Sequence, residues 1–222
     1  MAPRSRARTA GASAGTSAGT SAGRVIAGSA RGVRLIGPGE GTRPLGDRVK
    51  QTLFAILEPT IRGRPFLDLY AGSGSAGIEA LSRGASGAVF VESDRKAVRA
   101  IQRNLEATGL AGPSAVVSDR SVEGWLAKEG GGAGPFAAVV VDPPYDAPQE
   151  LNRTLAGIAE AGRGVVLADD GVVVAKHFWK APPEANRLLR SFRQERFGET
   201  ALSFYRWADD ARKRDASDEV AA

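Results

Sequence analysis

One segment, residues 65–92, constrains the fold more than any other part of the chain. Its pattern predicts an apolar strand over 65–70, a glycine-rich turn over 71–77, a helix over 78–83 and a second apolar strand over 87–92. A strand that leads through such a turn into a helix lets the backbone approach a ligand at the start of the helix. The segment therefore predicts two neighbouring strands of a parallel sheet, with a ligand at their carboxyl ends.

The same alternation continues toward the C-terminus. Strands are expected at 114–118, 137–141, 171–178, 193–197 and 201–207, helices at 94–108, 121–128, 149–161 and 183–192, and a glycine-rich surface loop at 129–135. Repeated units of this kind predict an α/β fold whose mostly parallel sheet carries helices on both faces. The last two strands are joined by Gly198-Glu199-Thr200 and predict a hairpin, so one edge of the sheet should be antiparallel.

The N-terminal part has a different composition. Its first residues are almost wholly Ala, Gly, Ser and Thr with three arginines, which cannot bury a core. A hairpin is expected over 24–36 and a helix over 47–57, with Arg48 and Lys50 off the apolar face of that helix. The domain boundaries that follow are a disordered basic tail (1–23), a hairpin and helix that form a lid over the site (24–64), the main domain (65–208) and a flexible C-terminal tail (209–222).

Composition limits the class of protein. The 222 residues suffice for one domain with a sizeable core. Cysteine is absent, which excludes disulfides and thiolate metal sites, and no clustered metal ligands stand out. No apolar stretch approaches the ~18 residues that a membrane-spanning helix needs. We therefore expect a cytoplasmic protein that is monomeric and has no metal and no membrane partner.

Basic charge is concentrated near the N-terminus. Residues 1–64 carry 11 Lys or Arg against 3 Asp or Glu, whereas the remaining residues carry 19 against 22. A one-sided basic segment is typical of a phosphate-binding surface, although an ordinary solvated face is the alternative. The candidate RNA-binding residues are Arg24, Arg31, Arg34, Arg43, Arg48, Lys50 and, beside the fifth main-domain strand, Lys176.

The tetrapeptide Asp142-Pro143-Pro144-Tyr145 follows the buried strand 137–141. The prolines lack a backbone N–H and hold the preceding residues extended, which leaves the Pro143 carbonyl free to face a ligand. That carbonyl and the Asp142 carboxylate are two acceptors, which match the two N–H donors of a primary amine on a heterocycle. Tyr145 offers a ring on which a base can stack, worth roughly 1–3 kcal/mol. A strand that ends in a proline turn with a surface tyrosine is the structural alternative.

The glycine-rich turn fits more than one cofactor. Gly72, Gly74 and Gly77 match the dinucleotide fingerprint G-x-G-x-x-G, and Glu92 ends the next strand, where a carboxylate can accept hydrogen bonds from ribose hydroxyls. A nicotinamide enzyme has no use for the tetrapeptide at 142–145. An S-adenosylmethionine (AdoMet) enzyme has a direct use for it, since the amine held there can attack the sulfonium methyl group.

With both motifs placed, the chain resembles the RsmD family of class I AdoMet-dependent methyltransferases, which modify the guanine N2 amine in small-subunit (16S) ribosomal RNA. The resemblance runs from about residue 24 to 207. Its parts are residues 24–28, Gly41-Thr42-Arg43-Pro44, residues 47–50, Leu53-Phe54, residues 68–74, the tetrapeptide at 142–145 and residues 202–206. The block at 41–44 is the most specific of them. One departure is Leu45-Gly46, where the family commonly has two threonines.

The resemblance implies a Rossmann-like seven-stranded sheet and a role for each matching residue. Ala71, Gly72, Ser73 and Gly74 would hold the methionine part of AdoMet, with Asp68 anchoring its amino group, Glu92 binding the ribose and Asp119 accepting from the adenine amine. Asp142, Pro143, Pro144 and Tyr145 would hold a flipped guanine. The partner implied is rRNA, within an assembled or late-assembling small subunit.

Other functions stay open at this stage. The same site could serve adenine in DNA or RNA, or a protein glutamine, although glutamine enzymes usually carry Asn in place of Asp142. More remote alternatives are an RNA-binding factor without catalysis and a nicotinamide oxidoreductase. His177, the single histidine, is expected to be structural or on the surface, because in-line attack by a hydrogen-bonded amine needs no base.

Overall fold

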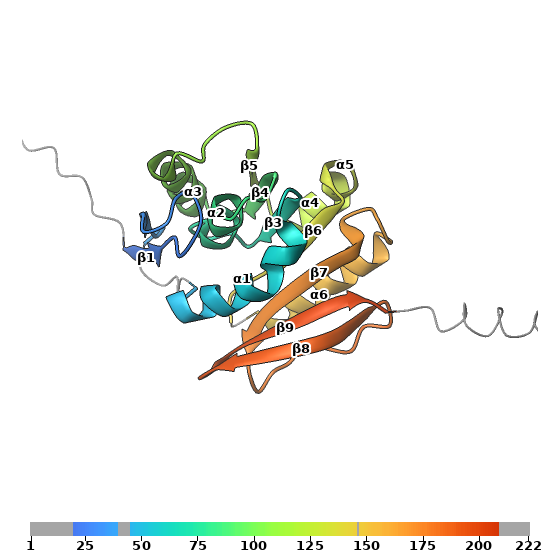
Figure 1. Ribbon diagram of the computed structural model, residues 1–222. Coiled ribbons are helices and arrows are strands. Elements are labelled where there is room, and N and C mark those ends of the chain that lie inside the picture. Colours follow the sequence, from blue (N-terminus) through green and yellow to red (C-terminus); the bar gives the residue numbers. More distant parts are fainter. Residues whose placement is uncertain (1–19, 40–44, 146, 209–222) are drawn as a thin grey trace, which may run out of the picture.

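The computed structural model of the protein describes residues 20–39, 45–145 and 147–208, in which a central sheet lies between two layers of helices (Figure 1). The strands are β1 (Ser21–Arg24), β2 (Arg34–Ile36), β3 (Pro65–Leu69), β4 (Gly87–Glu92), β5 (Ala115–Asp119), β6 (Phe136–Val141), β7 (Leu167–Phe178), β8 (Leu189–Phe197) and β9 (Thr200–Trp207). The helices are α1 (Asp47–Ile61), α2 (Ser75–Ser82), α3 (Arg95–Thr108), α4 (Val122–Lys128), α5 (Gly130–Ala133) and α6 (Pro148–Glu160).

The main sheet has seven strands in the order β5-β4-β3-β6-β7-β9-β8. The first five are parallel, β9 runs against β7, and β8 pairs with β9 as a hairpin at the edge. The expected mostly parallel sheet with an antiparallel edge is thus confirmed. Because β3, β4, β6 and β7 are parallel, their carboxyl ends, where the candidate residues stand, meet at one rim of the sheet.

Two apolar cores lie on opposite faces of this sheet. One contains buried side chains of α1, α2 and α3, and the other contains those of α4 and α6. Every residue of β6 is buried, as its continuous apolar sequence predicts for a central parallel strand. The expectation of helices on both faces is therefore confirmed.

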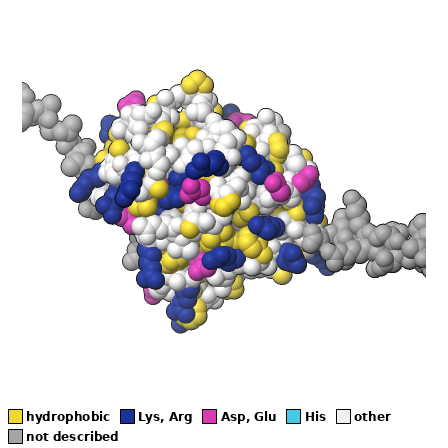
Figure 2. Space-filling view, in the orientation of Figure 1, with side chains coloured by type: hydrophobic (Ala, Val, Ile, Leu, Met, Phe, Trp, Pro, Cys, Tyr) yellow, Lys and Arg dark blue, Asp and Glu magenta, His cyan; other side chains and the backbone are white. Residues whose placement is uncertain are grey.

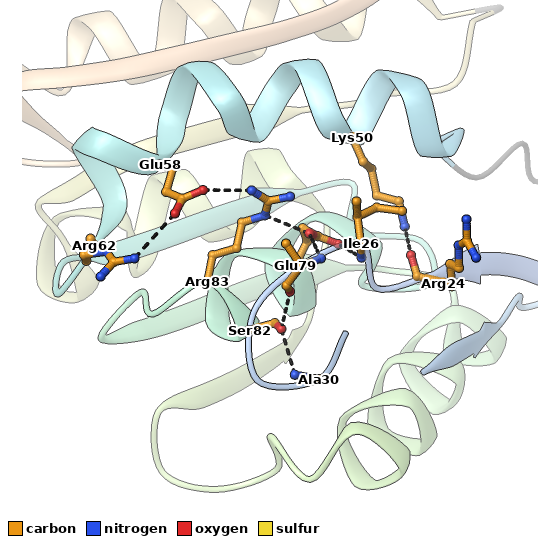
Figure 3. Close-up of polar contacts among 10 residues, drawn as sticks. Arg24, Ile26, Ala30, Lys50, Glu58, Arg62, Glu79, Ser82 and Arg83 are labelled. Atoms are coloured by element: carbon orange, nitrogen blue, oxygen red, sulfur yellow. Dashed lines mark hydrogen bonds and ion pairs between the residues drawn. The ribbon is translucent and has the colours of Figure 1, made fainter. Parts of the chain in front are cut away.

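The N-terminal extension packs against the main domain through buried polar contacts. Glu79 of α2 is fully buried and accepts hydrogen bonds from the backbone N–H groups of Ile26 and Ala27, at 2.7 and 3.0 Å (Figure 3). Its carboxylate also accepts from Arg83 at 2.8 Å. On α3, Asn104 exchanges hydrogen bonds with the backbone of Ile36. The hairpin is thereby fixed to the two helices that flank the glycine-rich turn.

Several sequence-based boundaries are wrong. The hairpin begins at Ser21, inside the expected tail, and the expected loop at 129–135 contains the short helix α5. The helix expected over 47–57 continues to Ile61, because burial of that side chain in the core holds the last turn despite Pro59. Most of the tail, the block at 41–44 and residues 209–222 lie outside the described residues.

The helix expected at 183–192 is also wrong. Residues 183–188 have no regular structure, and β8 begins at Leu189. The side chain of Asn186 accepts from the backbone N–H groups of Leu188 and Leu189, which competes with helix formation. Pairing of Leu189 with Trp207 in β9 then extends the sheet. Of the helices in the described ranges, none is long and apolar enough to cross a membrane.

Candidate active site

A cavity of about 810 Å³ opens at the carboxyl ends of β3, β4, β6 and β7. Of the predicted site residues, it is lined by Asp68, Ala71, Gly72, Ser73, Glu92, Asp142, Pro143, Pro144, Tyr145 and Lys176. Thr20, Pro38 and Leu45 of the N-terminal extension line it as well, so the extension borders the site. The structure thus brings the glycine-rich turn and the Asp-Pro-Pro-Tyr tetrapeptide together in one space.

The glycine-rich turn needs its glycines for two separate reasons. Gly72 and Gly74 have positive φ angles, 57° and 75°, which side-chain-bearing residues rarely adopt. Gly77 allows α2 to pack closely on β4, since a Cβ there would lie 2.2 Å from the ring of Phe90. The backbone N–H of Gly72 donates to Glu92 Oε2 at 2.8 Å, which ties the turn to the neighbouring strand.

Asp68 is a buried carboxyl group beneath this turn. It is 2% exposed and accepts a hydrogen bond from Gly77 N–H at 2.8 Å. Burial raises the pKa of Asp68 well above its ordinary value, the Gly77 N–H lowers it, and the negative charges of Asp142 and Glu92 raise it further. A carboxyl group in this setting gains from a nearby cation, because a positive charge offsets the cost of ionising it.

The raised pKa predicts that the difference in stability between the Asp68→Asn variant and the wild-type protein changes with pH. In the window between the ordinary and the raised pKa the folded protein binds a proton that the unfolded chain releases, so wild-type stability falls as pH rises. The neutral amide removes this loss, which amounts to about 1.4 kcal/mol per pH unit across the window. Between pH 4 and 8, the melting temperature of the variant minus that of the wild-type protein should increase as pH rises. Parallel curves would contradict the assignment.

Asp142 forms an ion pair inside the cavity. Lys176 of β7 donates to its two carboxylate oxygens at 2.7 and 2.9 Å. Burial raises the pKa of Asp142 and Lys176 lowers it, with burial the larger effect. The Lys176 nitrogen also lies 4.9 Å from the centre of the Tyr145 ring, and the Tyr145 hydroxyl is 2.7 Å from Thr200 Oγ1 in β9. The tetrapeptide is thus held from both β7 and β9.

A second cavity of about 440 Å³ adjoins the first on the other side of the tetrapeptide. It shares Pro143, Pro144, Tyr145 and Lys176 with the first cavity. The rest of its lining includes Leu151, Asn152, Phe178, Pro182, Pro183 and Thr200. The tetrapeptide therefore separates two hollows, and Tyr145, which is 41% exposed, presents its ring beside both.

Two of the predicted cofactor-binding residues stand differently from the rest. Gly74 is the N-terminal cap of α2 but does not line the cavity. Asp119 is exposed at the carboxyl end of β5, level with Glu92 in the sheet, and it does not line the cavity either. Arg43 lies outside the described residues.

His177 is buried, with its ring nitrogens 2.8 Å from the Phe178 carbonyl and 2.9 Å from Ser203 Oγ, and burial lowers its pKa.

The predicted RNA-binding residues separate into two groups. Arg24, Arg31, Arg34 and Arg48 are exposed. Lys50 is fully buried, and its ammonium donates to the carbonyl of Arg24, so the expectation that it faces RNA is wrong (Figure 3). Lys176 is bound to Asp142 inside the cavity, and its contact with a phosphate stays a prediction.

Sequence reasoning missed other basic residues and the polar residues that support the site. The β8–β9 hairpin exposes Arg190, Arg193, Arg196 and Arg206. Lys and Arg side chains also gather in the part of the surface where Figure 1 places this hairpin (Figure 2). The spacing of Glu79 and Arg83 fits a local ion pair, but nothing local indicated that Glu79 and Asn104 also bind the backbone of the extension, because those partners are 52 or more residues away.

Known proteins share the sequence and the fold that build this site. A family model described as conserved hypothetical protein 95 matches residues 23–206. YlbH of Bacillus subtilis, which carries the name of an rRNA methyltransferase, is 36% identical over 188 residues, with 82% of this chain and 98% of that protein covered. The chain belongs to the RsmD family.

Other members of the family agree with this result. Ribosomal RNA small subunit methyltransferase D of Escherichia coli K12 is 44% identical over 123 residues, which cover 55% of this chain and 60% of that protein. The solved structure of yhhF from Escherichia coli, described as a methyltransferase, matches with a TM-score of 0.71 at 33% identity, and covers 83% of this chain and 97% of that chain. The fold is therefore the class I methyltransferase fold that the resemblance implies. Among the described residues, no cluster of three or more His, Asp or Glu is suited to hold a metal ion.

Proposed function

We propose that the protein transfers a methyl group from AdoMet to the exocyclic N2 amine of a guanine in small-subunit ribosomal RNA. One observation carries the proposal: the Asp142 carboxylate, the Tyr145 ring and the glycine-rich turn line one cavity. Membership of a family whose relatives are named as rRNA methyltransferases supports the choice of rRNA. The choice of guanine N2 rests on the family resemblance together with the acceptors at 142 and 143.

The lining of the cavity fits AdoMet. Asp68 and Glu92 provide acceptors for an ammonium group and for ribose hydroxyls, while the N-terminus of α2 favours a carboxylate. The buried hydroxyl of Ser75, at the start of α2, has no hydrogen-bond partner among the described residues. An unpaired buried hydroxyl is costly, so a polar ligand atom would satisfy it. Asp119 would approach the adenine amine from the carboxyl end of β5.

The chain's own residues would prepare the amine. When bound, AdoMet supplies a methyl group on a sulfonium: the carbon–sulfur bond breaks, its electron pair stays on sulfur, and the amine nitrogen forms the new bond to carbon. Asp142 and the Pro143 carbonyl would accept the two amine hydrogens and localise the lone pair on nitrogen. Tyr145 would stack on the flipped base, which offsets part of the few kcal/mol that flipping costs. Asp142 would also take up the proton that the methylated amine must lose.

RNA binding is proposed for the exposed arginines of the extension, which borders the cavity. Arg31 precedes β2 and Arg34 begins it, and the residues that follow this strand, Gly37 and Pro38, line the cavity. Replacing both arginines with alanine should raise KM for RNA with little change in kcat. The slope of log affinity against log salt should flatten by about 1 for each phosphate that the variant no longer neutralises. An unchanged salt slope would remove these residues from the RNA surface.

The substrate class can be tested by incubating the protein with labelled AdoMet and one of three acceptors: unmethylated small ribosomal subunits, naked rRNA or duplex DNA. The proposal predicts label in the RNA samples and none in DNA. We expect subunits to be the better acceptor, because a domain of this size benefits from RNA that other proteins have already shaped, and we expect the protein to act as a monomer. Label in DNA, or in none of the three while AdoMet binds, would overturn the substrate assignment.

A further inference from the structure

Lys176 stands between the two cavities and lines both of them. Its side chain is 9% exposed, and that of Asp142 is 19% exposed. The ammonium donates to both oxygens of Asp142, at 2.7 and 2.9 Å, and lies 4.9 Å from the centre of the Tyr145 ring. One cation thus contacts both side chains through which the tetrapeptide would handle a base.

These contacts leave room for a second donor. A carboxylate offers about four lone-pair positions on its two oxygens, and an ammonium group has three hydrogens. Lys176 uses one position on each Asp142 oxygen. An incoming amine can therefore bond to Asp142 while the lysine stays in place. With both oxygens bonded to one ammonium, the carboxylate has a single orientation before the amine arrives.

We propose that Lys176 is a positioning residue for the target amine: its ammonium group fixes the Asp142 carboxylate and the Tyr145 ring in the arrangement that receives the base. The inference rests on the proposed function for the identity of the amine. The lysine itself does not contact the reacting atoms in this account. It acts through Asp142, whose charge and orientation it sets.

The charges around Asp142 give this role a measurable consequence. Asp68 of β3 and Lys176 of β7 interact with Asp142, and the other titratable groups that line the same cavity are Tyr70, Glu92, Asp94, Tyr145 and Glu150. Among the described residues that line the first cavity, Lys176 alone carries a positive charge. Burial raises the pKa of Asp142, and the lysine opposes that rise. Without the lysine, Asp142 would stay protonated to higher pH, and it would then lose its negative charge while one of its oxygens became a donor.

Two substitutions separate the charge of Lys176 from its bulk. Lys176→Met keeps an unbranched chain and removes the ammonium, whereas Lys176→Arg keeps the positive charge. Lys180→Met is the matched control, because Lys180 is exposed on the same rim and contacts Trp179, not Asp142. The first readout needs no activity: the carboxyl carbon of Asp142 is titrated by ¹³C NMR in each variant, and its signal is assigned with Asp142→Asn.

The proposal predicts that the titration midpoint of Asp142 rises by about 1 pH unit or more in Lys176→Met, since an opposite charge at this distance shifts a pKa by 1–3 units. It should stay near the wild-type value in Lys176→Arg and Lys180→Met. The second readout is the pH profile of kcat/KM for methyl transfer, whose acid limb should move with the NMR midpoint. A purely structural lysine would lower activity without moving this limb.

The outcomes are distinguishable. An unchanged midpoint in Lys176→Met, or a shifted midpoint with an unshifted acid limb, would overturn the positioning role. A midpoint that rises as much in Lys176→Arg as in Lys176→Met would also overturn the positioning role, because the positive charge of the lysine would then not be the cause of the shift. If the wild-type protein transfers no methyl group to any RNA, the proposed function fails, and the NMR titration still reports whether Lys176 controls Asp142.

Discussion

Replacing Asp142 with alanine is expected to lower methyl transfer by about 10³-fold, in the range found when a group that stabilises a transition state is removed. The affinity for S-adenosylhomocysteine should stay close to the wild-type value, because the glycine-rich turn, Asp68 and Glu92 remain. Asp142→Asn should lose less activity, since its amide oxygen keeps one acceptor without the charge. Single-turnover rates and calorimetric titration with S-adenosylhomocysteine measure the two effects separately.

The alanine variant needs a control for folding. It leaves the Lys176 ammonium buried without its partner, and breaking a buried ion pair from one side typically costs 3–5 kcal/mol. The double variant Asp142→Ala, Lys176→Met removes both charges and should recover much of the lost thermal stability. It should stay as inactive as the single variant. Methyl transfer at near wild-type rates in either variant would remove Asp142 from the reaction.

Replacing Glu79 with alanine is expected to lower the free energy of unfolding by about 3–5 kcal/mol, which for a chain of this size is a fall in melting temperature of about 10 °C or more. The substitution leaves the backbone N–H groups of Ile26 and Ala27 without their acceptor and removes a partner of Arg83 (Figure 3). Thermal melting measures the loss. Hydrogen exchange at Ile26 and Ala27 should accelerate together with it.

Glu58→Ala is the matched control for this prediction. Glu58 also pairs with Arg83, at 2.8 Å, but its side chain is 37% exposed. Its loss should cost no more than about 1 kcal/mol, as for other partly exposed ion pairs. Equal destabilisation by the two substitutions would show that Glu79 does not anchor the extension. Because residues of the extension line the cavity, Glu79→Ala should also weaken binding of S-adenosylhomocysteine.

The sequence was most informative where local chemistry decides the structure. The glycine-rich turn, the buried strand β6 and the tetrapeptide after it follow the predicted order, because positive φ angles and proline geometry act over a few residues, although α2 already begins at Ser75, inside the turn expected over 71–77. The parallel order of β3, β4 and β6 follows from the alternation of strands and helices. These elements bring most of the predicted site residues to one cavity.

Some errors arise where tertiary contacts outweigh local preference. Residues 189–192 have an apolar pattern that fits a helix, yet pairing with β9 makes them a strand. The expectation for Lys50 misread the helical spacing: Lys50 precedes Leu53 by three residues and Leu57 by seven, which places it on the buried face of α1, where its ammonium donates to the Arg24 carbonyl. Lys176 and Asp142 are 34 residues apart, and only the register of β6 and β7 makes them neighbours.

Identification of the methylated nucleoside decides whether the protein methylates the N2 amine of guanine. Small ribosomal subunits that lack the modification are incubated with the protein and AdoMet, and the rRNA is then digested to nucleosides and analysed by mass spectrometry against standards. We expect N2-methylguanosine from the wild-type protein and none from Asp142→Ala. Methyladenosine, a ring-methylated guanosine, or N2-methylguanosine formed equally by the Asp142→Ala variant would contradict this expectation.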